Sequence, residues 1–493
     1  MPARSNYAPP APVNAVGRAP ALPVFQPFST VLDPEANIVL KIGFGLLLLD
    51  IFFTVSRVLE IITVATNYYI PYLSTVIHVV TLFTILLSGM LRPIATSSTG
   101  VLLLLFTSWM FICTLFSTWR GGSADTILHQ WLPAVTLYFA CGLIVTLRQC
   151  GKVCNVLGLS VIVIAAASFF VASSKDQRLS FEAGTLGNSN ELGFLLLLGS
   201  AFFLFPLLRP GASFVSRSFA AAGGLLTLSV AFHTGSRASL LAMIAMLLVL
   251  LWTRSVLGKL KLMFTALLVG VMVVALAPAQ ILQRYSTIFS QAETRADLSN
   301  EALASSTVRK ELLQESLMVT LQHPLFGVGP GIYAAAMAGE ASREGRRARW
   351  SVSHNTFTQV SSEMGIPALL LYLAAIWSAF RDALRMRSLS LRNGSGYGDA
   401  LATALLVSLT CACVSSFFGS NAYVAWLPLL MGLSAAFRLS LQRELERPVA
   451  APAVPTPAVP TQDVARVGQP KPLFKPAPAN SYRFLGRRRR FRG

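Results

Sequence analysis

The stretch "SHNTFTQVSSEMGIPALLLYLAAIWSA", residues 353–379, joins a polar start to an apolar run long enough to cross a membrane. A membrane-spanning helix needs about 20 mostly apolar residues. The whole chain has a similar character, because 54% of its 493 residues are hydrophobic, only 12% are charged and the mean hydropathy is +0.61. In lipid, backbone polar groups must pair within their own segment, which favours helices. We therefore predict an all-α integral membrane protein.

About twelve apolar runs meet this length criterion. They predict a bundle of about twelve transmembrane helices, with one large loop between the ninth and the tenth. Within the first run, Lys41 is expected to reach the membrane surface and Asp50 to face the bundle interior, because a carboxylate in hydrocarbon is costly. The runs lie near residues 37–59, 70–91, 99–118, 127–147, 153–173, 189–208, 215–234, 237–253, 260–280, 356–379, 400–418 and 421–438.

The distribution of basic residues predicts the orientation of the bundle. If the N-terminus is cytoplasmic, the short inner loops hold twelve Lys and Arg residues, whereas the short outer loops hold only Arg57, Arg120, Lys175, Arg178 and Arg237. Cytoplasmic loops of membrane proteins carry the excess of positive charge. Both ends are therefore expected in the cytoplasm, and the long loop is expected outside.

The expected organisation has five parts. Residues 1–36 form a disordered cytoplasmic N-terminus without the pattern of a cleavable signal peptide. Residues 37–280 hold helices one to nine, 281–353 form the outer loop with short helices, and 354–438 hold helices ten to twelve. Residues 439–493 form a disordered Pro-rich tail that ends in the basic cluster Arg487 to Arg490 plus Arg492. Beside a membrane, such a cluster is expected to attract anionic lipid headgroups rather than nucleic acid.

The six cysteines lack the spacing of a zinc site or a disulfide framework, so neither a metal nor a cofactor is expected. In the outer loop, apolar residues at helical spacing predict a helix that begins near Ser305 to Thr307 and stops at Pro324, lying on or just above the membrane. The glycines in "FGVGPG", residues 326–331, favour a turn with unusual backbone angles over a phosphate-binding loop.

Three further polar positions lie at the predicted outer face. Arg237, in "TGSRASLLA", is either an arginine that anchors a helix end or an anion clamp, since a guanidinium offers a fixed fork of donors to phosphate oxygens. Asn188, in "GNSNELG", is either the N-cap of the sixth helix, with Glu191 three residues on, or part of a polar pocket wall. His354 alone reads as a surface histidine.

The combination of Arg237, Arg309 and His354 suggests chemistry, because all three are predicted on the outer side. Nearby positive charge lowers the proton affinity of an imidazole. Such a site can hold an anionic leaving group on the arginines while the imidazole takes a proton from an incoming hydroxyl.

With "GNSNELG", "TGSRASLLA", "HPLFGVGPGIY" and "SHNTFTQVSSEMGIPALLLY" in this order, the sequence resembles the O-antigen ligase and Wzy polymerase superfamily. In motif terms the resemblance covers roughly residues 180–380. The ligase pattern of His followed by Asn, Ser or Gln, then nine intervening residues and a Gly, is met by His354, Asn355 and Gly365. Its last position, usually Gly, Thr or Tyr, is Ala368 here.

The resemblance implies a metal-independent glycosyltransferase at the periplasmic face of the bacterial inner membrane. Its donor would be a glycan on undecaprenyl diphosphate, and its acceptor a hydroxyl of lipid A-core or of a growing polysaccharide. By the same resemblance His354 would activate the acceptor hydroxyl, Arg237 would bind the diphosphate, and Arg309 and then Arg284 would be further diphosphate contacts. The supporting residues would be Asn355, Asn188 and Gly365.

The sequence leaves the acceptor open. A ligase and a Wzy-type polymerase both fit, and a protein O-oligosaccharyltransferase is a further alternative. A transporter, including the bicarbonate-transport proteins of the same superfamily, would need paired polar groups near the membrane midplane. Asp50 is one candidate for such a group, but the polar motifs gather at one face. A scaffold for polysaccharide assembly is a third class.

Overall fold

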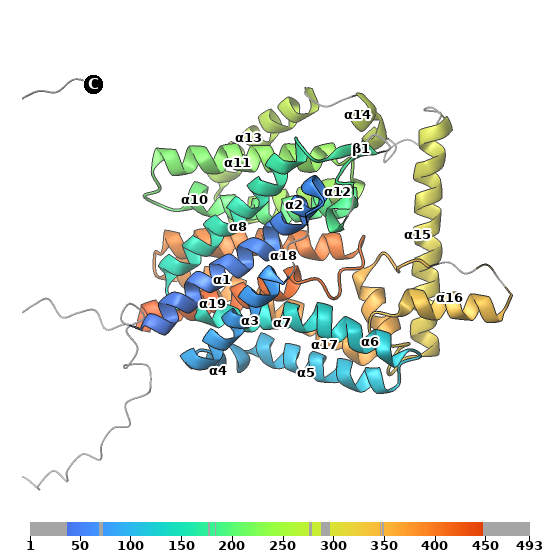
Figure 1. Ribbon diagram of the computed structural model, residues 1–493. Helices are drawn as coiled ribbons and strands as arrows, with labels where there is room; N and C mark the ends of the chain where they lie inside the picture. The colour runs from blue at the N-terminus through green and yellow to red at the C-terminus, as the bar shows by residue number, and fades with distance from the viewer. Residues whose placement is uncertain are drawn as a thin grey trace, which may run out of the picture. The chain divides into compact units, whose positions relative to one another are not determined.

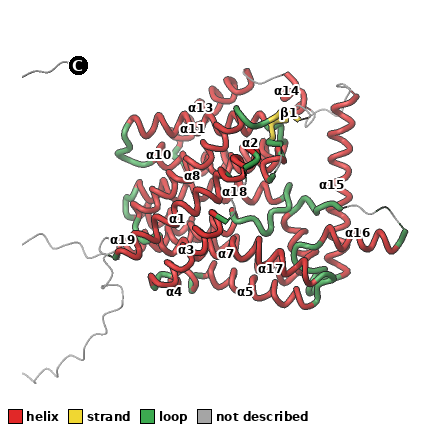
Figure 2. The backbone as a smooth tube through the Cα atoms, in the orientation of Figure 1, coloured by secondary structure: helices red, strands yellow, loops and turns green. Residues whose placement is uncertain are grey.

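The computed structural model describes residues 37–68, 72–175, 178–182, 184–275, 279–286, 296–345, 347 and 350–446. The expected N-terminal segment 1–36 and the tail from residue 447 onward lie outside these ranges. The described chain is helical apart from one short antiparallel hairpin, β1 (Ser173–Lys175) with β2 (Arg178–Ser180), drawn in yellow in Figure 2. The predicted all-α class is therefore correct.

Helices of the first half of the chain lead up to the long predicted loop. They are α1 (Ile38–Ser56), α2 (Val58–Thr66), α3 (Leu73–Ser88), α4 (Leu91–Ala95), α5 (Ser98–Leu115), α6 (Arg120–Thr126), the π-helix η2 (Ile127–Trp131), α7 (Leu132–Ala140), the 3-10 helix η3 (Cys141–Leu143), α8 (Leu147–Ser168), the 3-10 helix η4 (Thr185–Gly187), α9 (Ser189–Ser200), the 3-10 helix η5 (Ala201–Phe203), α10 (Leu204–Leu208), α11 (Phe214–His233), α12 (Arg237–Thr253) and α13 (Val256–Ala275).

The remaining helices begin with three in the predicted outer loop. They are α14 (Ala279–Ser286), α15 (Ala296–Gln322), α16 (Tyr333–Arg343), α17 (Thr356–Arg392), α18 (Gly396–Ser416) and α19 (Trp426–Glu446). Figure 1 shows α15 standing across the direction in which most other helices run.

Each of the twelve predicted apolar runs contains helix. Eight stretches among the described residues are long and apolar enough to cross a membrane: α1, α5, α8, α9 with α10, α11, α13, α17 and α18. Two apolar helices, α3 and α12, are shorter. The structure thus confirms a helical protein with several candidate spans, whereas the number twelve stays a prediction.

Several predicted boundaries differ from the structure; for example, α17 continues to Arg392, past the expected end at residue 379. The loop helix does not begin near Ser305, because α15 already starts at Ala296. At the other end of the chain, α19 continues to Glu446, past the expected end at residue 438. Polar residues that resemble caps or the start of a tail can continue a helix when nothing in the backbone stops it.

Short polar side chains begin many of the helices. Asn37, Ser97, Ser213 and Ser395 accept hydrogen bonds from main-chain N–H groups in the first turns of α1, α5, α11 and α18. Such caps satisfy donors that have no partner inside the helix.

Asp50 lies in the interior of the bundle, as predicted, and is only 2% exposed. Its Oδ2 lies 2.9 Å from Nδ1 of His78, and the other ring nitrogen of His78 contacts the Thr136 hydroxyl. These side chains connect α1, α3 and α7, and the pairing reduces the cost of burying the carboxylate.

Candidate functional site

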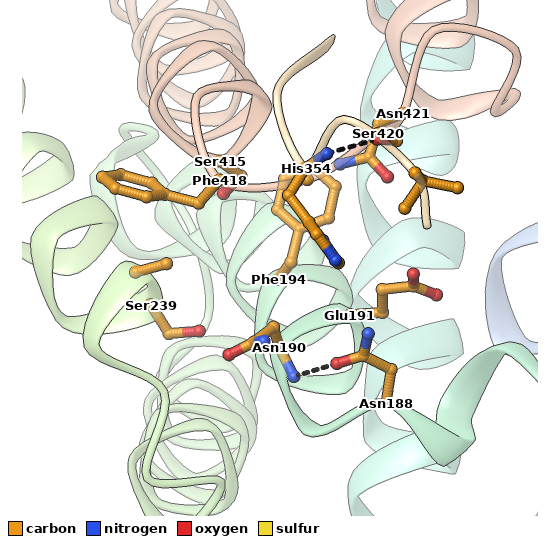
Figure 3. Close-up of a pocket in the computed structure, with 13 residues that line it drawn as sticks. Asn188, Asn190, Glu191, Phe194, Ser239, His354, Ser415, Phe418, Ser420 and Asn421 are labelled. Carbon is orange, nitrogen blue, oxygen red and sulfur yellow. Dashed lines mark hydrogen bonds between the residues drawn. The ribbon is translucent and has the colours of Figure 1, made fainter. Parts of the chain in front are cut away.

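A polar pocket lies where α9, α12 and α17 all begin. It encloses about 170 Å³, several times the volume of one water in the liquid. It is lined by Asn188, Asn190, Glu191, Phe194, Ala238, Ser239, Val352, His354, Ser415, Phe418, Gly419, Ser420 and Asn421 (Figure 3). Three of the four sequence motifs thus meet here, together with the loop between α18 and α19.

The α9 wall begins with Asn188, whose side chain accepts a hydrogen bond of 2.9 Å from the main-chain N–H of Asn190. Asn188 is therefore the N-cap of α9, and it also lines the pocket, so both predicted roles hold. Arg178, from β2, reaches across this wall. Its guanidinium donates to Oδ1 of Asn190 at 2.8 Å and to the main-chain oxygen of Thr234 at 3.2 Å. Arg178 thereby fastens the start of α9 to the turn before α12.

The α12 wall starts at Arg237, the first residue of that helix. Ser236 caps the helix by accepting from the main-chain N–H of Ser239 at 3.2 Å. Arg237 is half-buried, and the two residues that follow it, Ala238 and Ser239, line the pocket. Arg237 thus lies next to the rim of the pocket at the N-terminus of α12, where the helix dipole favours anions.

His354 enters the pocket from the opposite wall (Figure 3). Its backbone has φ 52°, a left-handed conformation that is uncommon for a residue with a side chain. The conformation is held by a hydrogen bond of 2.9 Å from the main-chain N–H of His354 to Oγ of Ser420. An unusual backbone angle that the surroundings enforce is frequent at functional sites.

The loop between α18 and α19 holds the residues after His354 in place. Asn355 caps α17 by accepting from the main-chain N–H groups of Phe357 and Thr358. The hydroxyl of Thr356 donates to the Gly419 carbonyl at 2.7 Å and accepts from the Asn421 N–H at 3.0 Å. The imidazole is therefore carried by backbone that is bonded on both sides.

The electrostatics connect the three residues that the sequence singled out. Burial is the main cause that lowers the pKa of His354 below its ordinary value, and the positive charge of Arg309 lowers it further. The pKa of Arg309, on α15, is itself lowered by burial and then by the charge of Arg237. Arg309 thus lies near enough to act on His354, and Arg237 lies near enough to act on Arg309. Arg284 lies on α14, but its side chain is outside what the structure describes.

The segment "HPLFGVGPGIY" packs against the first part of α17. The left-handed glycines Gly327, Gly329 and Gly331 give it the unusual turn predicted from sequence. Its main-chain N–H groups at Val328 and Gly329 donate to the carbonyls of Ser362 and Glu363, at 3.0 and 2.9 Å. Pro367 blocks helical bonding to the carbonyl four residues before it, so Gly329 satisfies a group that the helix cannot.

Glu363 is the centre of a buried network that the sequence analysis missed. The side chain is 2% exposed and accepts from the N–H groups of Gly331 and Tyr333, at 3.0 and 3.4 Å, and from the hydroxyl of Tyr423. The charge of Glu363 and, foremost, burial raise the pKa of Tyr423 well above its ordinary value. The network joins the predicted outer loop, α17 and the loop that holds His354.

Glu363 and Arg178 could have been found only partly from sequence. A carboxylate inside the apolar run 356–379 indicates a buried partner, since ionisable groups there are costly. For Arg178 no local pattern exists, because its partners Asn190 and Thr234 lie 12 and 56 residues further along the chain.

No group of three or more His, Cys, Asp or Glu side chains that could hold a metal ion occurs among the described residues. The site therefore consists of one imidazole, at least two guanidinium groups and a wall of amides and hydroxyls. It belongs to a multi-pass membrane protein whose candidate spans lead to one polar pocket.

The sequence model of the O-antigen ligase family matches residues 222–373, from within α11 to the middle of α17. The match includes "TGSRASLLA", "HPLFGVGPGIY" and the His354 motif, whereas "GNSNELG" lies before it. It confirms the resemblance to the O-antigen ligase and Wzy polymerase superfamily and supports a glycosyltransferase-like enzyme of polysaccharide synthesis. The curated proteins contain no match to the chain.

Proposed function

We propose that the protein transfers a glycan from undecaprenyl diphosphate to an acceptor hydroxyl, as an O-antigen ligase. The observation that carries this proposal is the placement of His354 in a polar pocket, where the charge of Arg309 acts on it. The charge of Arg237 acts in turn on Arg309. An imidazole beside clustered guanidinium groups suits a reaction in which a hydroxyl loses a proton and a diphosphate leaves.

In this mechanism the lowered pKa keeps His354 neutral, so that it can accept a proton. The imidazole takes the proton of the acceptor hydroxyl as its oxygen forms a bond to the anomeric carbon. The bond from that carbon to the diphosphate oxygen breaks, and its electron pair leaves with undecaprenyl diphosphate. Arg237 and Arg309 stabilise the charge that develops on the leaving group, without a metal. The proton then passes from His354 to water.

The same proposal places the pocket at the periplasmic face of the inner membrane. About twelve spans would put both termini in the cytoplasm and α14 to α16 outside. Figure 1 supports this arrangement, because α15 runs across the bundle direction, as a helix lying along a membrane surface would.

A Wzy-type polymerase is the second candidate, favoured by Ala368. At this position the ligase pattern has Gly, Thr or Tyr. Ala368 is fully buried in α17 and does not line the pocket, so the departure leaves the polar wall unchanged. The acceptor would then be another lipid-linked repeat unit.

The test uses purified full-length protein with a glycan on undecaprenyl diphosphate, alone or with lipid A-core, and detects products by mass spectrometry. Growth of the glycan from donor alone identifies a polymerase, and glycan found only on lipid A-core identifies a ligase. His354→Ala should lower the transfer rate at least about 100-fold, and Arg237→Ala should also weaken donor binding.

Two matched variants control for folding and surface charge. His129→Ala removes an exposed histidine, and Arg343→Ala removes an exposed arginine at the end of α16. Both should transfer glycan like the unaltered protein. Full activity in monodisperse His354→Ala would refute the mechanism.

A further inference from the structure

The pocket has a second charged side that the proposed mechanism does not use. Glu191, in the first turn of α9, lines the pocket together with His354. The charges that act on its carboxylate come from Arg57 and Glu60, whereas the charge that acts on His354 comes from Arg309. The two sides of the pocket therefore have separate charged neighbours.

Figure 3 shows how these sides are arranged. Ser239, two residues after Arg237, lies on one side of the view, and Glu191 lies on the other side. The ring of His354 extends between them. We call the side formed by the start of α12 the arginine side, because α12 begins at Arg237 and the charge of Arg237 acts on Arg309. The opposite side, Glu191 with Arg57 and Glu60, is the Glu191 side.

On the Glu191 side, one of the two carboxylates is already engaged. Glu60 accepts from the hydroxyl of Thr185 at 2.8 and 2.9 Å and from the main-chain N–H of Leu186 at 3.2 Å, so it holds the turn that leads into α9. Glu191 has no hydrogen-bond or ion-pair partner among the residues that the structure describes. Its carboxylate is half-buried at the pocket wall, where a missing partner costs free energy.

Burial disfavours the charged form of this carboxylate, and the positive charge of Arg57 opposes that effect. Arg57 lies at the break between α1 and α2, with φ 51°, and its Nε is buried without a hydrogen-bond partner in the described part of the chain. A guanidinium this close favours the ionised form of Glu191. An ionised carboxylate accepts hydrogen bonds and donates none, so its natural ligand is a donor group.

The chemistry of the surrounding wall narrows the ligand further. Asn188, Asn190 and Asn421 add amide groups, and Ser420 adds a hydroxyl. Amides and carboxylates together suit a polyhydroxylated sugar, whose hydroxyls both donate and accept. A phosphate is disfavoured here, because the free carboxylate would repel it.

The geometry of the substitution at the anomeric carbon indicates whether the donor sugar or the acceptor sugar binds on the Glu191 side. An attacking oxygen approaches the anomeric carbon from the face opposite to the leaving group. With the diphosphate on the arginine side, the acceptor enters from the Glu191 side, and its hydroxyl comes within reach of His354 between them. We infer that Glu191 and the amide wall around it form the subsite for the acceptor sugar. This inference rests on the proposed function.

The test varies the acceptor at saturating donor and measures KM and kcat for Glu191→Gln, Glu191→Ala and Glu191→Asp. Lipid A-core is the acceptor if the protein proves to be a ligase. If it is a polymerase, the acceptor is a soluble oligosaccharide of the repeat unit, which carries hydroxyls but no diphosphate. Glu340→Gln, on the exposed face of α16, is the matched control.

Loss of the Glu191 carboxylate, a charged group that accepts hydrogen bonds, should raise the KM for the acceptor substrate. The expected increase is about tenfold in Glu191→Gln and about 100-fold in Glu191→Ala. Glu191→Asp keeps the charge on a shorter side chain and should fall between Glu191→Gln and the unaltered protein. Direct titration with undecaprenyl diphosphate should give the same affinity, within about twofold, for Glu191→Gln and the control.

An unchanged acceptor KM in folded Glu191→Gln would overturn the inference. So would a loss of undecaprenyl diphosphate affinity as large as that in Arg237→Ala, because Glu191 would then serve the donor. These outcomes are interpreted only after His354→Ala has been shown to lose glycan transfer. If His354→Ala transfers normally, the proposed function itself has failed, which is a different result.

Discussion

At the scale of single residues, His354 makes a prediction about pH. Burial and the charge of Arg309 lower its pKa, so the imidazole stays neutral to a lower pH than an ordinary histidine. A base works only when it is unprotonated, so kcat should rise with pH through this lowered pKa, below the ordinary value of 6.5. Arg309→Gln removes the positive charge but leaves the His354 imidazole almost as buried as before. The acidic limb of the kcat profile should therefore move to higher pH in this variant.

The neighbouring Lys310 provides the control for this experiment. It lies on the same helix and is exposed, so Lys310→Gln removes a charge without uncovering the pocket. Its pH profile should match that of the unaltered protein. An acidic limb that stays in place in Arg309→Gln, or moves to lower pH, would contradict the role given to Arg309.

Candidate site residues could be predicted from sequence where a single side chain is itself charged or titratable. His354 and Arg237 are titratable or charged groups beside apolar runs, and the cost of such groups near lipid makes each conspicuous. Arg309, in the outer loop, is singled out by its combination with these two and by the family resemblance. Glu363 and Tyr423 bind each other across 60 residues of chain. No short stretch of sequence indicates such a pair, because the packing of whole helices brings the two side chains together.

At the scale of elements, the kink in α17 explains the glycine of the His354 motif. Gly365 has φ 80° and ψ 177°, a region open essentially to glycine alone. An added Cβ would lie 2.0 Å from the carbonyl oxygen of Leu325. The close approach lets the N–H of Ile366 donate to the Pro324 carbonyl at 2.8 Å, which fixes the outer loop on the helix.

Gly365→Ala should therefore destabilise the protein by more than about 3 kcal/mol, from backbone strain and overpacking together. Thermal unfolding in detergent measures this loss. The control is Gly339→Ala, at an open position within α16, where a methyl group meets nothing within 4 Å. That change should stabilise the helix by up to about 1 kcal/mol. Equal melting temperatures for the two variants would rule out the close-approach explanation.

The sequence predicted this helix but not its kink. The apolar run predicted from residue 356 gives the start of α17 correctly, because such a run is a local property, whereas the helix continues past the expected end at residue 379 to Arg392. Gly365 and Pro367 indicate a break in the helix, yet only the contact with residues 324–325 shows why the chain bends. The early start of α15 was missed for a related reason, since its polar first turns lack the apolar spacing that marks a helix.

At the scale of the whole described chain, α9, α12 and α17 begin together at the pocket. At the far ends of α12 and α17, two arginines contact Asp399: Arg387 donates to its Oδ1 at 3.1 Å, and Arg254 donates to its Oδ2 at 3.5 Å. Burial lowers the pKa of Arg254, while the charge of Asp399 opposes this effect. These arginines lie at the end away from the pocket, where the short loops carry the excess of positive charge that the positive-inside rule expects of a cytoplasmic end.

This polarity predicts opposite locations for two points on the chain. Alkaline phosphatase, which needs its disulfides and so matures only in the periplasm, should be active when fused after Gly345, between α16 and α17. Fused after Glu446, at the end of α19, it should be inactive, and a green fluorescent protein fused there should fluoresce. Arg254, Arg387 and Asp399 would then face the cytoplasm, and the His354 pocket the periplasm. Equal phosphatase activity at both points would contradict an odd number of spans between them. Active enzyme only after Glu446 would mean that the bundle has the opposite orientation. The pocket would then lie where no periplasmic acceptor could reach it.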